Sequence, residues 1–360
     1  MNGWAAGLAE AAIGLLLIAV VLWDTFQTVV LPRPAHTRIR LARTLTRLAW
    51  PLWRGRAVRK TTNVDQEKIL GSFAPALVVI VLMAWIALLI LGFGLVMFAL
   101  RDELSPTPDF GTALYFAGES ILTIGFGDIG AVGGLSRVAA VVGGALGLGV
   151  LALGITYLFS LYGSFQRRET LVVRLEPRAG APPSGVALLE TYAADDMRAA
   201  LPAFFLEWEA WAAEVLDTHV AYPILPYFRS SHDNASWVSA LGAVLDAAAL
   251  VLTCVEDGPT GEATMVQRLG GHVVEDLSNF FGWQQTRVAL VARTEFDEAR
   301  ERLSAAGWTL READEAWERF VMIRSGYAAR LNEMALFWVT PPALWIGDRG
   351  AVRHLPAPPA

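Results

Sequence analysis

The sequence predicts an all-α membrane protein with three transmembrane helices, followed by a mostly helical domain. Two observations carry this prediction: residues 69–100 and residues 138–166 contain no charged side chain. As α-helices these runs would be about 48 Å and 44 Å long, whereas a bilayer core requires only about 20 residues. A third observation is that the loops between the apolar segments differ in the sign of their charge, which fixes their sides of the membrane.

The first apolar segment is interpreted as a transmembrane helix over about residues 8–31, within an N-terminal region of residues 1–31. Asp24 interrupts this segment, and a carboxylate at the centre of a bilayer costs about 3 kcal/mol. Two interpretations are open. Asp24 pairs with a basic group of the following loop as a coupling residue, or it lies at the inner membrane interface close to Arg33. The second is favoured because Asp24 lies near the basic end of the segment.

The basic loop of residues 32–68 is expected to be cytoplasmic, because residues 32–66 hold nine basic residues and one acid. Residues 101–109 hold three acids and one base and are expected outside. The protein is therefore expected to be a multi-pass protein of the cell membrane, with the N-terminus outside and the C-terminal domain in the cytoplasm. Apolar residues alternate with the arginines of the loop: Leu41, Leu45, Leu48, Trp50 and Trp53. This pattern indicates an amphipathic helix on membrane lipid, and a solvated linker is the alternative.

Residues 120–128 read Ser-Ile-Leu-Thr-Ile-Gly-Phe-Gly-Asp and form the most informative motif. The motif follows a short run, residues 109–122, that is expected to re-enter the membrane as a helix. Gly125 and Gly127 can adopt left-handed dihedrals, so successive carbonyls can face one axis and replace the water around a cation. An ordinary glycine turn is the alternative, but irregular backbone between two apolar spans requires a cavity to line.

The hexapeptide Thr123–Asp128 resembles the selectivity filter of the potassium-channel superfamily, in its Gly-Phe-Gly variant. The resemblance implies an ion-binding segment made of Thr123, Ile124, Gly125, Phe126 and Gly127, with K⁺ held at the first four of these residues. It also implies a pore domain over residues 69–166, made of an outer helix, the re-entrant pore loop with its helix and filter, and an inner helix. One filter occurs per chain and the family gathers four, so a homotetramer is expected. The N-terminal helix is an addition to the family's two-helix plan.

Residues beside this segment are expected to support it. Some bacterial members of the family carry a glutamate paired behind the filter with the aspartate that follows it, and Glu119 and Asp128 occupy those positions. Two carboxylates this close would share a proton. Ser120 stands where the family often has threonine. Tyr115 and Phe116 match the aromatic residues that surround the filter in the family.

The third span is rich in glycine, and most of its glycines are interpreted as helix-packing positions. Gly147 lies 20 residues after Gly127, where many family members have a hinge glycine. Leu151, Ile155 and Phe159 follow at four-residue spacing, on one stripe of the helix. Such a stripe would close a pore by dewetting. Plain helix packing is the alternative interpretation of this hinge and gate.

The composition changes after residue 165. Residues 166–360 hold 26 acidic and 17 basic residues, against 9 acidic and 12 basic residues in 1–165. A linker is expected over 167–184, with an extended segment at 171–175. A helical cytoplasmic domain is expected over 185–350, with a tail over 351–360.

Helical spacing within the cytoplasmic domain is clearest in an apolar stripe made of Phe204, Phe205, Trp208, Trp211 and Val215. Residues 235–254 are apolar enough for a fourth span. However, Asp246 lies near their centre and no basic loop follows them, which favours a buried helix of a bundle.

Nothing in the second half of the chain indicates catalysis. No Gly-x-Gly-x-x-Gly motif follows a strand, Cys254 is the single cysteine, and no cofactor is expected. The acidic balance argues against nucleic-acid binding. A proline-rich turn with Pro223 and Pro226 is either a structural turn between two helices, which is favoured, or a site for an unknown cytoplasmic ligand. The residues around it are His219, Tyr222, Arg229 and His232.

The sequence therefore predicts a potassium-selective channel that is not an enzyme. A weakly selective cation channel is one alternative, because Phe126 lacks the tyrosine hydroxyl that braces most filters of the family. A membrane-anchored sensor with a vestigial pore is the other.

Overall fold

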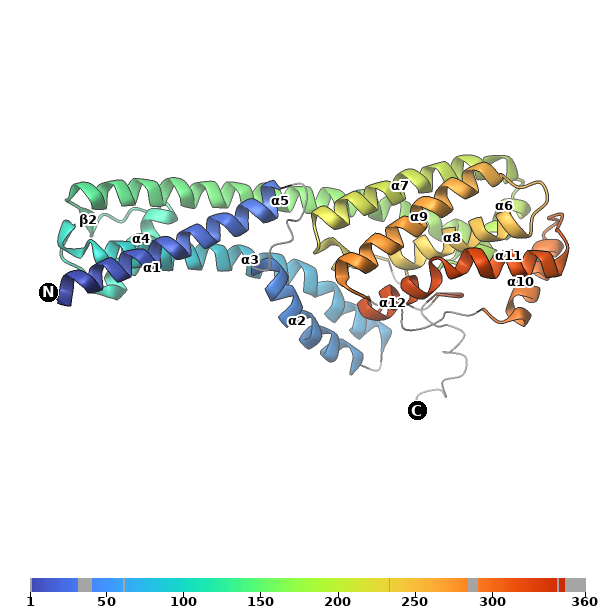
Figure 1. Cartoon of the computed structure of the whole chain (residues 1–360), viewed down its shortest axis with the longest axis horizontal. Coiled ribbons are helices and arrows are strands. Elements are labelled where there is room, and N and C mark those ends of the chain that lie inside the picture. The colour runs from blue at the N-terminus through green and yellow to red at the C-terminus, as the bar shows by residue number, and fades with distance from the viewer. Residues whose placement is uncertain are drawn as a thin grey trace. The chain divides into compact units, whose positions relative to one another are not determined.

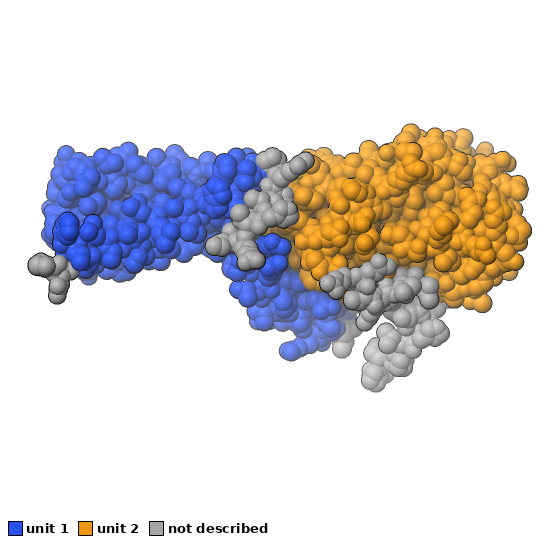
Figure 2. Space-filling model, in the orientation of Figure 1, with its two compact units in different colours: residues 1–162 blue, residues 163–360 orange. Residues whose placement is uncertain are grey.

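The computed structural model describes residues 2–31, 41–60, 62–232, 234–283, 291–341 and 343–346. The chain forms two compact units, residues 1–162 and residues 163–360, which are coloured separately in Figure 2. Almost all of the described chain is helical (Figure 1), so the predicted all-α class is confirmed. The predicted tail, residues 351–360, lies outside the described residues.

The first unit contains the three apolar helices that the sequence predicts, and each is long enough to cross a membrane. Its elements are α1 (Asn2–Thr25), the π-helical turn η1 (Phe26–Val30), α2 (Leu41–Val58), α3 (Asn63–Ala99), η2 (Arg101–Glu103), β1 (Leu104–Ser105), α4 (Phe110–Ile121), β2 (Gly130–Ala131) and the start of α5 (Gly134–Ala179). The short helix α4 is the predicted re-entrant helix. It contacts α3, and so do α1 and α2.

Polar caps and a two-stranded pairing hold the segment between α3 and α5. The side chain of Asp109 accepts a hydrogen bond from the Thr112 backbone N–H at 2.7 Å and starts α4 as an N-cap. The strands β1 and β2 pair antiparallel on either side of α4 and the following segment. Glu103 accepts a hydrogen bond from the backbone N–H of Ser136 at 2.9 Å, which joins the loop before α4 to the start of α5.

Asp24 is buried and serves as a hydrogen-bond acceptor. Its two carboxylate oxygens accept from the indole N–H of Trp85 at 2.7 Å and from the backbone N–H of Leu41 at 2.8 Å. The carboxylate thus joins α1 to α3 and to the first residue of α2, and within the described residues no Lys or Arg is bonded to it. Arg33, the neighbour that the sequence suggested, lies outside the described residues.

The helix expected in the basic loop is confirmed as α2. Its buried face packs on α3, where the rings of Trp50 and Phe73 lie 5.0 Å apart. The indole N–H of Trp53 donates to the Ser72 hydroxyl at 3.3 Å. The opposite face exposes apolar and basic side chains together, and it is described further below.

The extended segment predicted at residues 171–175 is wrong, because α5 continues as a helix to Ala179. The expected linker is therefore helical over most of its length. Pro177 and Gly180 suggested an irregular segment, but Pro177 lies only two residues before the helix end. Gly180 then adopts φ +82° and turns the chain away, which glycine does without steric cost.

The second unit is a helical bundle around α8 (Trp237–Thr253), in which every residue except Leu252 is buried. The prediction of a buried bundle helix for residues 235–254 is confirmed. The surrounding elements are the end of α5, α6 (Gly185–Ala194), η3 (Arg198–Ala200), α7 (Leu201–Ala221), η4 (Leu225–Tyr227), α9 (Thr260–Phe281), α10 (Arg293–Ala305), α11 (Ala313–Ser325) and α12 (Ala328–Trp338). The aromatic stripe predicted on α7 is buried in this bundle.

Hydrogen bonds from a buried arginine hold the corner after α7. Arg168 on α5 is buried, and its guanidinium donates to the carbonyl oxygens of Leu225 at 3.0 Å and Phe228 at 2.7 Å. It also lies 3.0 Å from Nε2 of His219. Burial and the neighbouring Arg168 cation lower the pKa of His219 well below its usual value. The imidazole is therefore neutral at pH 7 and accepts from the guanidinium.

Candidate functional site

The candidate ion-binding segment begins where α4 ends at Ile121. Two backbone hydrogen bonds turn the chain back along the helix end: the Thr123 N–H donates to the Ser120 carbonyl at 3.2 Å, and the Ile124 N–H donates to the Glu119 carbonyl at 2.8 Å. The segment thus starts at the carbonyl end of a helix. That end carries a partial negative charge, which favours a cation nearby.

Alternate residues of the segment are left-handed. Thr123, Gly125 and Gly127 have φ values of +54°, +64° and +79°, whereas Ile124 and Phe126 do not have positive φ. The prediction for the two glycines is confirmed. Thr123 is a β-branched residue in this region, which is strained, and such strain concentrates at functional sites.

The carbonyl oxygens of residues 123–127 accept no hydrogen bond from any part of the chain that the structure describes. All five residues are exposed in the single chain. A row of unpaired carbonyls is costly unless water or an ion satisfies it. The arrangement therefore suits the coordination of a cation with little hydration.

The two carboxylates beside the segment each have a different partner. Glu119 is buried, and its Oε2 accepts from the Phe126 backbone N–H at 3.2 Å. Asp128 accepts from the Tyr115 hydroxyl at 3.1 Å. Within the described residues no hydrogen bond joins Glu119 to Asp128, so the shared proton stays a prediction. Ser120 contributes its carbonyl to the turn described above.

Tyr115 has a role that the sequence did not reveal. Its ring stacks on that of Phe126, with centroids 6.2 Å apart and planes 6° apart, while its hydroxyl donates to Asp128. Phe126 has no hydroxyl of its own, and α4 supplies one from Tyr115 instead. One feature of the sequence could have indicated this role of Tyr115: the motif contains a phenylalanine, and a tyrosine lies eleven residues before it.

For the conduction of K⁺ through this segment that is proposed below, we expect Tyr115→Phe to lower the ratio of K⁺ to Na⁺ permeability several-fold. The substitution keeps the ring stacked on Phe126 but removes a hydrogen bond to a charged acceptor, a contact worth about 1.5–3 kcal/mol when it is shielded from water. The measurement is the reversal potential of the purified protein in a bilayer under K⁺/Na⁺ exchange. A permeability ratio equal to that of the wild type would show that the hydroxyl does not brace the segment.

The glycines of α5 permit close helix contact in the first unit. A Cβ at Gly147 would lie 2.3 Å from the Ile121 carbonyl oxygen, and one at Gly154 would lie 2.9 Å from Leu82. The packing interpretation therefore applies to Gly147 as well, and α5 is helical through it. The candidate gate residues differ: Ile155 and Phe159 are exposed by 56% and 76%, while Leu151 is half-buried.

The described part of the chain holds no cluster of three His, Cys, Asp or Glu side chains suited to a metal ion. The unpaired backbone oxygens of residues 123–127 remain the candidate cation ligands that the geometry above offers.

Comparison with known proteins agrees with this geometry. Residues 85–163 match the protein family described as "Ion channel". Over 205 residues the chain is 25% identical to a Bacillus subtilis (strain 168) protein named "Uncharacterized membrane protein YdjJ", a match that covers 56% of this chain and 58% of that protein. The match thus spans less than two thirds of the relative's length. No solved structure matches the chain. The matched family segment holds the end of α3, α4, residues 123–127 and the first part of α5. The match supports a potassium-channel-type superfamily for this region of the chain.

Proposed function

We propose that this protein is a homotetrameric potassium-selective channel that conducts K⁺ through Thr123–Gly127. One observation carries the proposal: five consecutive carbonyl oxygens accept no hydrogen bond from the described part of the chain, and alternate residues of their backbone are left-handed. Oxygens ordered in this way replace the hydration shell of K⁺ and pass the ion between adjacent sites.

The proposed tetramer follows from the number of filters per chain. One chain supplies one row of carbonyls, which surrounds an ion on a single side. Several rows around an axis are needed to complete the coordination, and closed symmetry supplies them. Exposure of Ile124 and Phe126 in the single chain, 51% and 67%, is consistent with burial of these side chains by neighbouring subunits.

The proposed topology places the N-terminus outside and the C-terminal domain, residues 185–350, in the cytoplasm. The basic residues of α2 and its flanks support this orientation, because positive charge remains on the cytoplasmic side. Reporter tags at residue 2 and residue 360 of the full chain, probed from outside intact cells, provide the check.

The test of the function is ion flux in liposomes that contain only the purified protein. The expected result is K⁺ flux with a reversal potential that follows the K⁺ gradient when Na⁺ replaces K⁺ on one side, and a detergent-corrected mass of four chains. A reversal potential indifferent to this exchange would instead indicate a weakly selective cation channel. Absence of any flux from folded tetramers would indicate a membrane-anchored sensor with a vestigial pore.

The proposed gate is the exposed stripe of Ile155 and Phe159 on α5, with Leu151 beside it. We expect Phe159→Ala to raise the resting K⁺ flux, because four smaller side chains leave a wider and more easily wetted constriction. The measurement is flux without a stimulus, and Leu206→Ala is the matched control, since Leu206 is an exposed apolar residue of the second unit. Equal resting flux in the wild type and Phe159→Ala would place the gate elsewhere.

The proposed lipid contact is the outer face of α2. Leu48 and Leu52 are exposed by 66% and 65%, next to the exposed Arg47 and Arg54, and α2 contains no acidic residue. Such a face binds the surface of an anionic membrane, where each basic residue contributes about 1 kcal/mol.

We expect Arg47→Gln with Arg54→Gln to weaken this lipid contact by about 2 kcal/mol. The readout is backbone hydrogen exchange of α2 in nanodiscs: anionic lipid should slow exchange in the wild type more than in the double variant. Arg319→Gln with Arg330→Gln in the second unit is the control for a change of net charge. Protection of α2 that does not depend on lipid charge would contradict the proposed contact.

A further inference from the structure

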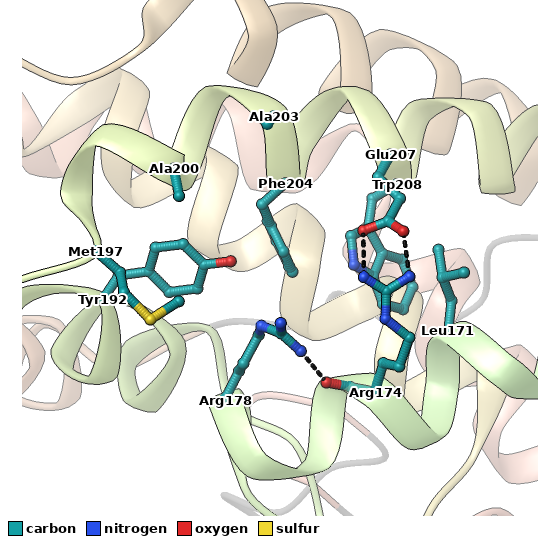
Figure 3. Close-up of a pocket in the computed structure, with 10 residues that line it drawn as sticks. All are labelled: Leu171, Arg174, Arg178, Tyr192, Met197, Ala200, Ala203, Phe204, Glu207 and Trp208. Carbon is teal, nitrogen blue, oxygen red and sulfur yellow. Dashed lines mark hydrogen bonds and ion pairs between the residues drawn. The ribbon is translucent and has the colours of Figure 1, made fainter. Parts of the chain in front are cut away.

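The second unit contains a cavity of about 450 Å³ between the end of α5 and the segments that form α6 and α7 (Figure 3). Pockets for small molecules commonly measure about 300–1,000 Å³. Its lining combines two arginines, one glutamate and three aromatic rings: Arg174, Arg178, Glu207, Tyr192, Phe204 and Trp208. Neither the ion pathway nor the corner around Arg168 uses these side chains.

The two arginines give the cavity a net positive charge. They are four residues apart on α5 and therefore lie on one side of the helix, as Figure 3 shows. Glu207 forms an ion pair with Arg174, whereas no ion pair joins Arg178 to a carboxylate within the described residues. The guanidinium of Arg178 donates to the Arg174 carbonyl at 2.6 Å, and its Nε is buried with no acceptor among the described residues.

The charge of the cavity contrasts with that of its surroundings. Residues 166–360 carry 26 acidic against 17 basic side chains, and yet two cations face one carboxylate here. The Arg178 guanidinium meets two neutral groups, the Arg174 carbonyl and the Tyr192 side chain, and its Nε is buried with no acceptor among the described residues. Such a guanidinium retains capacity for an oxyanion. The Glu207 carboxylate on Arg174 already occupies half of such a site.

The remaining wall of the cavity is mostly apolar and contains three aromatic rings. Tyr192, Phe204 and Trp208 are buried, and the Phe204 ring lies 5.5 Å from that of Tyr192 and 5.9 Å from that of Trp208. Ala200 and Ala203 line the same space and leave it open, because their side chains are small. The hydroxyl of Tyr192 and the guanidinium of Arg178 point toward a common region in Figure 3.

We propose that this cavity binds a small organic phosphate with a flat apolar body. The phosphate would bridge Arg174 and Arg178, and the apolar body would lie against Phe204 and the two alanines. Two guanidinium groups match a dianionic phosphate with bidentate geometry. The ligand would compete with Glu207 for Arg174. Its binding would therefore break the ion pair between α5 and α7 and replace it with a contact between Arg174 and the phosphate.

The experiment is calorimetric titration of the full-length protein in detergent, with phenyl phosphate as the probe. We expect saturable binding of phenyl phosphate, at least about tenfold weaker binding of inorganic phosphate, which lacks the apolar body, and no measurable binding of phenol. Arg178→Gln should weaken binding of phenyl phosphate at least about tenfold, because it removes a charged donor. Glu207→Gln should strengthen binding, because it removes the competing carboxylate from Arg174.

The matched control is Arg302→Gln, which breaks an exposed ion pair with Glu190 and should leave the affinity unchanged. Equal affinity for phenyl phosphate in the wild type and in Arg178→Gln, with both proteins folded as judged by circular dichroism, would overturn the proposal. So would equal affinity for phenyl phosphate and inorganic phosphate. Binding is measured without ion flux, so failure of this site and failure of the proposed channel are distinguishable.

Discussion

Gly125→Ala is expected to abolish K⁺ flux while leaving the fold of the chain intact. Gly125 has φ +64°, and an alanine with this φ costs about 1–2 kcal/mol. The alanine therefore favours another backbone conformation, which turns the carbonyl of residue 125 away from the row of carbonyls formed by residues 123–127. The four alanines of a tetramer would together cost about 4–8 kcal/mol. This cost lowers the population of tetramers in the conducting conformation at least about a hundredfold. The measurement is K⁺ flux in liposomes at equal protein content.

The structure separates this backbone effect from crowding within the subunit. A Cβ at Gly125 would meet nothing within 4 Å, so the substitution acts through the dihedral angle. Gly261→Ala is the matched control, because Gly261 also has open space around it but lies in α9 without a positive φ. Flux in Gly125→Ala comparable to that of the control would mean that the carbonyls of residues 123–127 do not coordinate the ion.

The sequence predicted best where one short segment determines its own structure. The three spans follow from hydropathy, and the left-handed Gly125 and Gly127 follow from the absence of a Cβ. The hydrogen bond of the Tyr115 hydroxyl was missed because it depends on how α4 is rotated against the segment that follows it. The acceptor role of Asp24 was missed because its partner, Trp85, is 61 residues away on another helix.

The region after residue 166 shows where prediction from the sequence fails, because its structure depends on segments that are distant in the chain. Its proline and glycine content indicated a linker, but these residues lie in the last turn of α5 and just beyond it. Seven earlier residues of the expected linker, 167–173, contain neither residue type, and burial of Arg168 in the second unit stabilises them as a helix. The arginines of the proposed anion cavity were therefore assigned to a linker, since their neighbours come from α6 and α7.

The centre of the second unit contains a buried ion pair. Asp246 on α8 accepts from Nε of Arg324 at 3.0 Å and from the Tyr327 hydroxyl at 2.5 Å. Both charged side chains are less than 5% exposed. Burial raises the pKa of Asp246, and Arg324 and Tyr327 oppose that rise. The carboxylate of Asp246 thus depends on the guanidinium to remain ionised inside an apolar bundle.

Arg324→Met is expected to destabilise the protein by about 3–5 kcal/mol, because it leaves a buried carboxylate without its cation. In thermal unfolding of the full chain in detergent this corresponds to a fall in Tm on the order of 10 °C. Arg293→Met is the matched control: its exposed ion pairs with Asp297 and Asp314 each contribute at most about 1 kcal/mol. An equal Tm in the two variants would contradict the dependence of Asp246 on Arg324.

Two further measurements distinguish an unpaired charge from lost packing. Adding Asp246→Leu to Arg324→Met should recover more than half of the lost stability, because an apolar pair replaces a buried ion pair at little cost. The loss in Arg324→Met should also shrink as the pH falls. Without the cation the folded-state pKa of Asp246 rises further above that of the unfolded chain, so the destabilisation grows as the pH rises between these two values and vanishes below both. A loss of Tm that is independent of pH and persists in the double variant would assign the effect to the packing of the Arg324 side chain.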